Sequence, residues 1–127
     1  MSGFYFDVIL YSMKIELTRF KIKEGKSGRV DEWLKMINDR MPEALATLKD
    51  EKMYFETIFR DKNDDGDFLW WLDVRGEGGI KPGESKHQLD IDHRVFFEEC
   101  IDRKFGKFDL YPEVALIPED IRKLMGD

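Results

Sequence analysis

The chain has 127 residues, of which 42% are hydrophobic, and 27 Asp and Glu against 21 Lys and Arg give a formal net charge of −6. That length suits one domain with a real core, and the hydrophobic content excludes an intrinsically disordered chain. Basic residues stand beside acids and form no stripe, which argues against nucleic-acid binding and membrane-surface binding. The single cysteine, Cys100, excludes an intramolecular disulfide and suits a reducing compartment, so we expect a cytoplasmic protein.

Residues 1–12 are apolar but lack the basic region and cleavage site of a secretory signal. They are also far too short to span a bilayer. Because a regular pattern begins at Met13, we interpret residues 1–12 as an N-terminal extension and residues 13–127 as a single domain with a short C-terminal helix.

The predicted elements begin with a strand from Lys14 to Ile22, where apolar and polar residues alternate. Apolar residues at helical spacing then predict a helix that ends near Arg40, since Pro42 would break its hydrogen-bond ladder and open a second short helix. Two further strands, Met53 to Arg60 and Phe68 to Arg75, flank a polar loop and predict a hairpin.

The second half of the chain adds a further helix, a strand and a short terminal helix. Ser85 and Gln88 have the spacing of a capping box at the start of the next helix. A last strand is predicted from Phe108 to Ile117, bent at Pro112, before the short terminal helix. The order β-α-β-β-α-β predicts an α+β ferredoxin-like fold, with an antiparallel sheet and helices on one face.

Alternation in the two hairpin strands divides their side chains between the faces of the sheet. We assign the wholly apolar set, Phe68, Trp70, Leu72 and Val74, to the face under the helices. The opposite face then carries Leu69, Trp71, Asp73 and Arg75 from one strand and Tyr54, Glu56, Ile58 and Arg60 from the other. Such a face is too apolar to remain in water, so we predict a homodimer that packs sheet against sheet.

Several segments carry a family resemblance and together span most of residues 13–121. They are KIKEGKSGRVDEWLKMIND, EKMYFETIFR, WWLDVRGEGG, SKHQLDIDH followed by EECID, and DLYPEVALIPEDI. They resemble a bacterial family of unknown function within the dimeric α/β-barrel superfamily. That superfamily includes cofactor-free monooxygenases, isomerases, sugar mutarotases, haem enzymes and ligand-binding modules without chemistry. The resemblance therefore implies a dimeric fold with a pocket between sheet and helices or inside the barrel, and it implies no particular reaction.

His93 is the strongest candidate for a catalytic residue, because it interrupts the apolar stripe of its helix. An imidazole that points at the sheet could act as an acid or base, or orient a ligand, near neutral pH. The alternative is a structural histidine satisfied by a strand carbonyl or carboxylate. Beside it we predict a ligand pocket formed by Tyr54, Glu56, Trp71, Asp73 and Arg75. Cross-strand ion pairs inside a dimer interface would explain these charged residues equally well.

The sequence predicts neither a metal nor a cofactor. His87, Asp90 and His93 spread around a helix, since each step of three residues turns by about 300°. The segment from Asp61 to Gly66 resembles part of a calcium loop, but Leu72 stands where its glutamate would be.

Two functional hypotheses follow from these patterns. In the first, a homodimer binds a small aromatic or polar organic molecule, with cofactor-independent monooxygenase-, isomerase- or mutarotase-like chemistry as an option. In the second, it is a non-catalytic dimeric binding or interaction module, and the same residues serve only the interface.

Overall fold

A computed structural model of the protein describes residues 13–79 and 84–126. Its strands are β1 (Lys14–Lys21), β2 (Met53–Asn63), β3 (Gly66–Arg75) and β4 (Lys107–Leu110), and its helices are α2 (Ser27–Asp39), α3 (Met41–Asp50), α4 (Gln88–Cys100) and α5 (Glu119–Leu124). The strands form one antiparallel sheet in the order β2-β3-β1-β4. The predicted α+β fold with βαββαβ order is confirmed. The predicted N-terminal extension lies outside the described residues.

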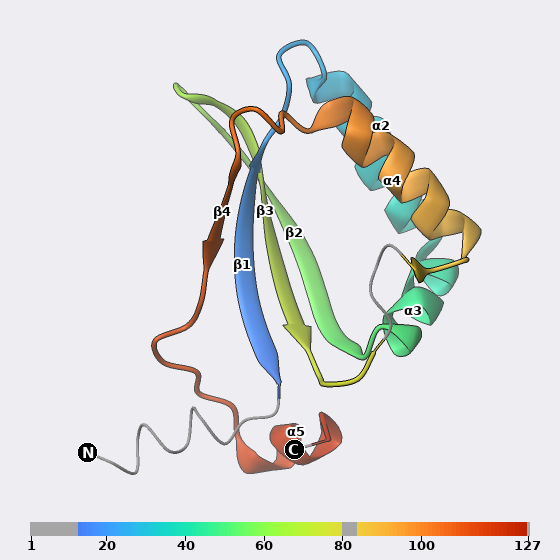
Figure 1. Cartoon of the computed structure of the whole chain (residues 1–127), viewed down its shortest axis with the longest axis vertical. Helices are drawn as coiled ribbons and strands as arrows, with labels where there is room; N and C mark the ends of the chain where they lie inside the picture. Colours follow the sequence, from blue (N-terminus) through green and yellow to red (C-terminus); the bar gives the residue numbers. More distant parts are fainter. Residues whose placement is uncertain (1–12, 80–83, 127) are drawn as a thin grey trace.

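The helices are distributed unequally about the sheet. Figure 1 shows α2, α3 and α4 together on one side of it, whereas α5 lies beyond the end of the strands. In the part of the chain that the structure describes, no helix combines the length and hydropathy of a membrane span. The sheet therefore has one face under helices and one face that no described helix covers.

The break between α2 and α3 follows the predicted position. Pro42 stands in the first turn of α3, where its missing N–H costs no helical hydrogen bond. Arg40 at the junction binds Glu43 through two nitrogen atoms and Asp92 of α4 at 2.7 Å. This contact ties the junction to α4 and holds three helical segments together over the sheet.

Three boundaries differ from the prediction. The helix α4 starts at Gln88 with no side-chain cap, because the Ser85 hydroxyl accepts a hydrogen bond from the His87 N–H instead. The hairpin strands reach Asn63 and Gly66, so only two residues form the turn. The last strand ends at Leu110 and not at residue 117, because Pro112 cannot donate to a ladder.

The assignment of side chains to sheet faces was wrong. Trp71 and Leu69 pack against α2 and α4, so their set faces the helices, and the wholly apolar set faces away. The inner face carries Glu16, Thr18, Phe20, Glu56, Ile58, Leu69, Trp71, Asp73 and Arg75, which strand register places together. The outer face carries Ile15, Leu17, Arg19, Phe55, Phe59, Phe68, Trp70, Leu72, Val74, Phe108 and Leu110.

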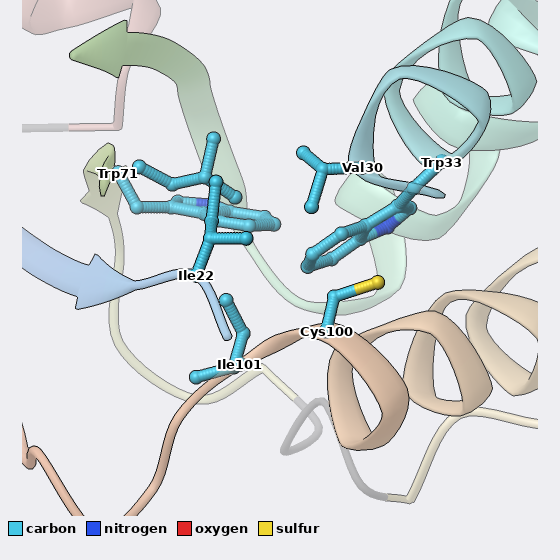
Figure 2. Packing of buried hydrophobic residues seen from close by; sticks show 7 residues of the cluster. Ile22, Val30, Trp33, Trp71, Cys100 and Ile101 are labelled. Carbon is cyan, nitrogen blue, oxygen red and sulfur yellow. The ribbon is translucent and has the colours of Figure 1, made fainter. Parts of the chain in front are cut away.

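The packed core lies at one end of the space between sheet and helices. Trp33 and Val30 of α2, Leu69 of β3 and Cys100 of α4 are fully buried there. Figure 2 shows Trp33 and Trp71 projecting toward each other across this core, and their ring centroids are 6.0 Å apart. The other end of the same space is a cavity.

Candidate functional site

The cavity lies between the inner face of the sheet and the helices α2, α3 and α4 and has a volume of about 700 Å³. That is within the usual range for small-molecule sites. Trp71, Phe20 and Phe97 provide aromatic surface, and five acidic side chains also line it, namely Glu16, Glu51, Glu56, Asp73 and Asp90. Its cations are Arg75, Arg94 and Lys107.

Three of the acids form a row across adjacent strands. Glu16 of β1 pairs in register with Asp73 of β3, and Asp73 pairs with Glu56 of β2. Side chains directly opposite on neighbouring strands have Cβ atoms about 5 Å apart, so like charges there are unfavourable. Arg75 offsets one end of the row through Glu16 at 3.5 Å. Among the described residues, the Asp73 Oδ1 atom is buried and has no hydrogen-bond partner.

The Glu56 and Asp73 carboxyl groups resist ionisation together. Burial raises the pKa of Glu56 to about 7, and the neighbouring charges of Asp73 and Glu51 act in the same direction, while a hydrogen bond with Trp71 opposes them. Burial also raises the pKa of Asp73, against the effect of Arg75. A hydrogen bond with Glu56 lowers the pKa of Asp73, against the larger effect of burial. Near neutral pH the Glu56 carboxyl group is close to its midpoint, so it can give or take a proton beside Asp73.

His93 lies opposite the sheet on α4, and its neighbours settle its tautomer. The Trp33 indole N–H, which can only donate, donates to His93 Nδ1 at 2.9 Å. Burial lowers the pKa of His93 to about 4, although Asp90 opposes this shift. The imidazole is therefore neutral at pH 7, with its proton on Nε2. In that state His93 is a hydrogen-bond donor toward a ligand and not a base.

Glu51 and Asp90 form a second pair of acids, on the helical wall of the cavity. Glu51 follows the last residue of α3, and Asp90 lies in the first turn of α4. Burial raises the pKa of Glu51 to about 7, and the charges of Asp90 and Asp73 add to this. The cavity thus has carboxyl groups on both walls.

The structure brings most of the predicted site residues together. His93, Glu56, Trp71, Asp73 and Arg75 all line the cavity. Tyr54 does not, because an irregularity in the ladder between Met53 and Phe55 takes it out of alternation and leaves it 39% exposed.

Sequence reasoning missed Glu16, Glu51 and Asp90. Glu16 could have been found from the alternation of β1, which places it with Thr18 and Phe20. Asp90 stands three residues before His93, but its position early in a helix already had an explanation in the helix dipole. Glu51 lies in a turn, where no periodicity marks it.

A metal has no evident place in the described part of the chain, where no group of three or more His, Cys, Asp or Glu side chains could hold one. The Nε2 atom of His87 lies 2.8 Å from Asp50.

The chain was compared with family models, curated proteins and solved structures. A family model described as "Family of unknown function (DUF6176)" matches residues 13–123. No curated protein matches the sequence. Among solved structures, the crystal structure of an L-rhamnose mutarotase from Formosa agariphila is similar over 84% of this chain and 99% of that chain, with 15% sequence identity and a TM-score of 0.49.

Proposed function

The chain belongs to the family of unknown function whose model matches residues 13–123, and we propose that it binds a small polyhydroxylated molecule and catalyses a cofactor-independent proton transfer on it. The observation that carries this proposal is the Glu56–Asp73 pair, two carboxyl groups in register on adjacent strands that line the cavity and whose pKa values burial raises. A carboxyl group whose pKa is raised toward 7 can act as an acid or a base near neutral pH.

The interconversion of sugar anomers is the reaction that this pair fits best. The anomeric hydroxyl and the ring oxygen are bonded to the same carbon, so acid and base must be neighbours. The Asp73 carboxylate removes the proton of the anomeric hydroxyl, Glu56 protonates the ring oxygen, and the bond between the anomeric carbon and the ring oxygen breaks. After rotation in the open-chain aldehyde, the reverse transfers close the ring on the other face. The carboxyl pair starts and ends with one proton.

The lining of the cavity favours hydroxyl-rich ligands over other classes. Its excess of acids repels phosphorylated or carboxylated molecules, and a purely aromatic substrate would leave the carboxyl groups of the lining without donors. Sugar hydroxyls can donate to these acceptors, while the C–H face of a sugar ring can pack on Trp71. Monooxygenase-like chemistry on an aromatic substrate is therefore the weaker option.

We assign His93 an orienting role in this reaction. With Nδ1 occupied by Trp33, the Nε2–H group is available to donate to a ligand oxygen. Replacement of Trp33 by Phe would remove the donor to His93 Nδ1, so the imidazole could carry its proton on either nitrogen. His93 is therefore a positioning donor, whereas the proton transfers belong to Glu56 and Asp73.

The test is anomer exchange followed by NMR with a panel of aldohexoses and deoxyhexoses. The wild type should accelerate exchange of at least one sugar, and Glu56→Gln and Asp73→Asn should each lower the catalysed rate about 100-fold or more. Glu113→Gln, an exposed acid outside the cavity, is the matched control. Binding without any acceleration would support the alternative, a non-catalytic binding module. Absence of binding to every sugar would refute the proposal.

We also propose a homodimer, in which a second copy of the chain covers the outer face and not the face with Trp71 that the sequence analysis assigned to the interface. Phe59 is 53% exposed there. The Arg19 guanidinium packs over four aromatic rings, those of Phe68, Trp70, Phe105 and Phe108. Its Nε atom is buried without a partner among the described residues. An equally apolar face, with a carbonyl acceptor for Arg19, is what a twofold-related copy could supply, as in the dimeric α/β-barrel superfamily that the sequence resembles.

Sedimentation velocity tests the dimer. Phe59→Lys should raise the dissociation constant at least about 100-fold, because two copies of a buried charge enter one interface. Ile91→Lys replaces an exposed apolar residue of α4 and should have no effect. A wild type that remains monomeric at micromolar concentration would contradict this part of the proposal.

A further inference from the structure

The helical wall of the cavity contains two acceptors that nothing in the described chain satisfies. Glu51 is only 8% exposed and lines the cavity, and its carboxyl oxygens stay accessible from there. The Asp90 Oδ2 atom is buried and lacks a hydrogen-bond partner among the described residues. A buried carboxyl oxygen without a donor is costly, and native proteins rarely keep one without a reason.

The two acids interact with each other and with the sheet. The Asp90 charge raises the pKa of Glu51, as does Asp73. Glu56 lines the cavity as well, whereas Asp50 lies outside it beside His87 and raises the pKa of Glu51 through its charge. Among the cations, Arg75 opposes the shift. The remaining cations of the lining are Arg94 and Lys107. A positive charge on a ligand near Glu51 and Asp90 would relieve this repulsion and favour ionised Glu51.

We propose that Glu51 and Asp90 form a subsite for a primary ammonium group, so that the ligand is an amino sugar or amino polyol. This inference rests on the proposed function and names its substrate class. A hydroxyl has one proton to donate and can satisfy one of the two carboxyl groups. An ammonium has three donors, satisfies both, and cancels charge as well. The sheet pair Glu56–Asp73 keeps its role in proton transfer at the other wall.

Isothermal titration calorimetry with matched sugar pairs tests the subsite. Each pair differs in one group: glucose and glucosamine, galactose and galactosamine, mannose and mannosamine. At pH 7.5 the wild type should bind the amine member of at least one pair about tenfold more tightly, because a charge-assisted hydrogen bond is roughly twice as strong as a neutral one. The double variant Glu51→Gln with Asp90→Asn should bind both members equally. Glu113→Gln should keep the preference.

A proton-linked readout separates this role from a structural one. When the ammonium binds, Glu51 should lose its proton, so binding at pH 7 should release protons in the wild type. The release is measured from binding heats in two buffers of different ionisation enthalpy. Glu51→Gln should abolish it, while circular dichroism confirms that the variant is folded. Removal of a crowded buried charge is not expected to unfold the chain.

The outcomes distinguish this inference from the proposed function. If neutral sugars bind or exchange anomers but no amine is preferred, the ammonium subsite is wrong and the proposed function stands. If the double variant keeps an amine preference, residues other than Glu51 and Asp90 bind the ammonium group, and the proposed subsite is also wrong. If no sugar of either kind binds, both proposals fail together.

Discussion

In an ordinary amphipathic sheet the apolar face lies under the helices and the polar face lies in water. Here the two faces of the sheet differ in the reverse sense. The inner face, under the helices, carries a row of three carboxyl groups, Glu16, Asp73 and Glu56. The outer face, which no described helix covers, carries exposed aromatic residues such as Phe55 and Phe59. Both arrangements cost stability in an isolated chain, because acids are desolvated on one face and apolar surface is hydrated on the other. This difference supports the two proposals made above, a ligand on the inner face and a second copy of the chain on the outer one.

Two adjacent residues of β3 show the contrast most clearly. Trp71 points inward, is 9% exposed, and packs against Trp33, Phe20 and His93. Trp70 points outward, where its indole donates to Asp61 at 3.0 Å and its ring lies under the Arg19 guanidinium. Because the two rings have the same size and differ in face, they are matched probes of the comparison.

The largest expected effect is on the free energy of unfolding of Trp71→Ala. Its loss should be about 3 to 5 kcal/mol, since a large buried ring leaves a cavity. Trp70→Ala should cost about 1 to 2 kcal/mol at low protein concentration, from the lost hydrogen bond and cation–π contact. If a second copy covers the outer face, the Trp70→Ala cost should grow with protein concentration, whereas the Trp71→Ala cost should grow less.

Urea denaturation at two protein concentrations measures these costs. Equal costs for the two variants at low concentration would remove the distinction between the faces. A Trp70→Ala cost that does not change with concentration would count against the partner on the outer face.

The second expected effect is on the pH dependence of stability. In the folded protein the pKa of Glu56 is about 7, whereas its ordinary value is 4.5. Between pH 4.5 and pH 7 the folded protein therefore binds more protons than the unfolded chain. Stability from Glu56 is therefore present at low pH and is lost as pH rises through 7. His93 acts in the opposite sense, because its pKa is lowered from 6.5 to about 4 and stability rises over that interval.

A difference between two proteins isolates the Glu56 contribution, because the His93 contribution is common to both. The free energy of unfolding of the wild type minus that of Glu56→Gln should fall by about 3 kcal/mol between about pH 4 and pH 8. Chemical denaturation over that range measures it, with Glu113→Gln as the control that should show no slope. A flat difference for Glu56→Gln would mean that the carboxyl row is hydrated and ordinary.

The sequence was sufficient for the topology because each element has a clear period or break. Alternation grouped Glu56, Trp71, Asp73 and Arg75 correctly, and helical spacing turned His93 toward the sheet. Neither period says which face of a strand lies under the helices, since a shift by one residue exchanges the two faces. The apolar set was placed inward on the ordinary rule, which fails here because charged residues of the cavity lining occupy the inner face.

The remaining site residues depend on geometry that no period records. Tyr54 does not line the pocket, because the strand pairing is irregular between Met53 and Phe55. Glu51 lines it from the turn between α3 and β2, where no periodic pattern marks a position. Such turns are set by local backbone conformation, which a hydrophobic pattern does not encode.

The smallest expected effect concerns that turn, which connects the helical wall to the inner face. Lys52 has a φ of 54°, in the left-handed region that favours glycine, and its carbonyl accepts a hydrogen bond from the Gly76 N–H at 2.7 Å. Lys52→Gly should therefore raise the free energy of unfolding by up to about 1 kcal/mol, offset in part by the greater freedom of glycine in the unfolded chain. Ala46→Gly in the exposed middle of α3 should lower it by about 1 kcal/mol. Thermal denaturation compares the two variants, and destabilisation by both would show that the Lys52 side chain contributes more than its backbone strain costs.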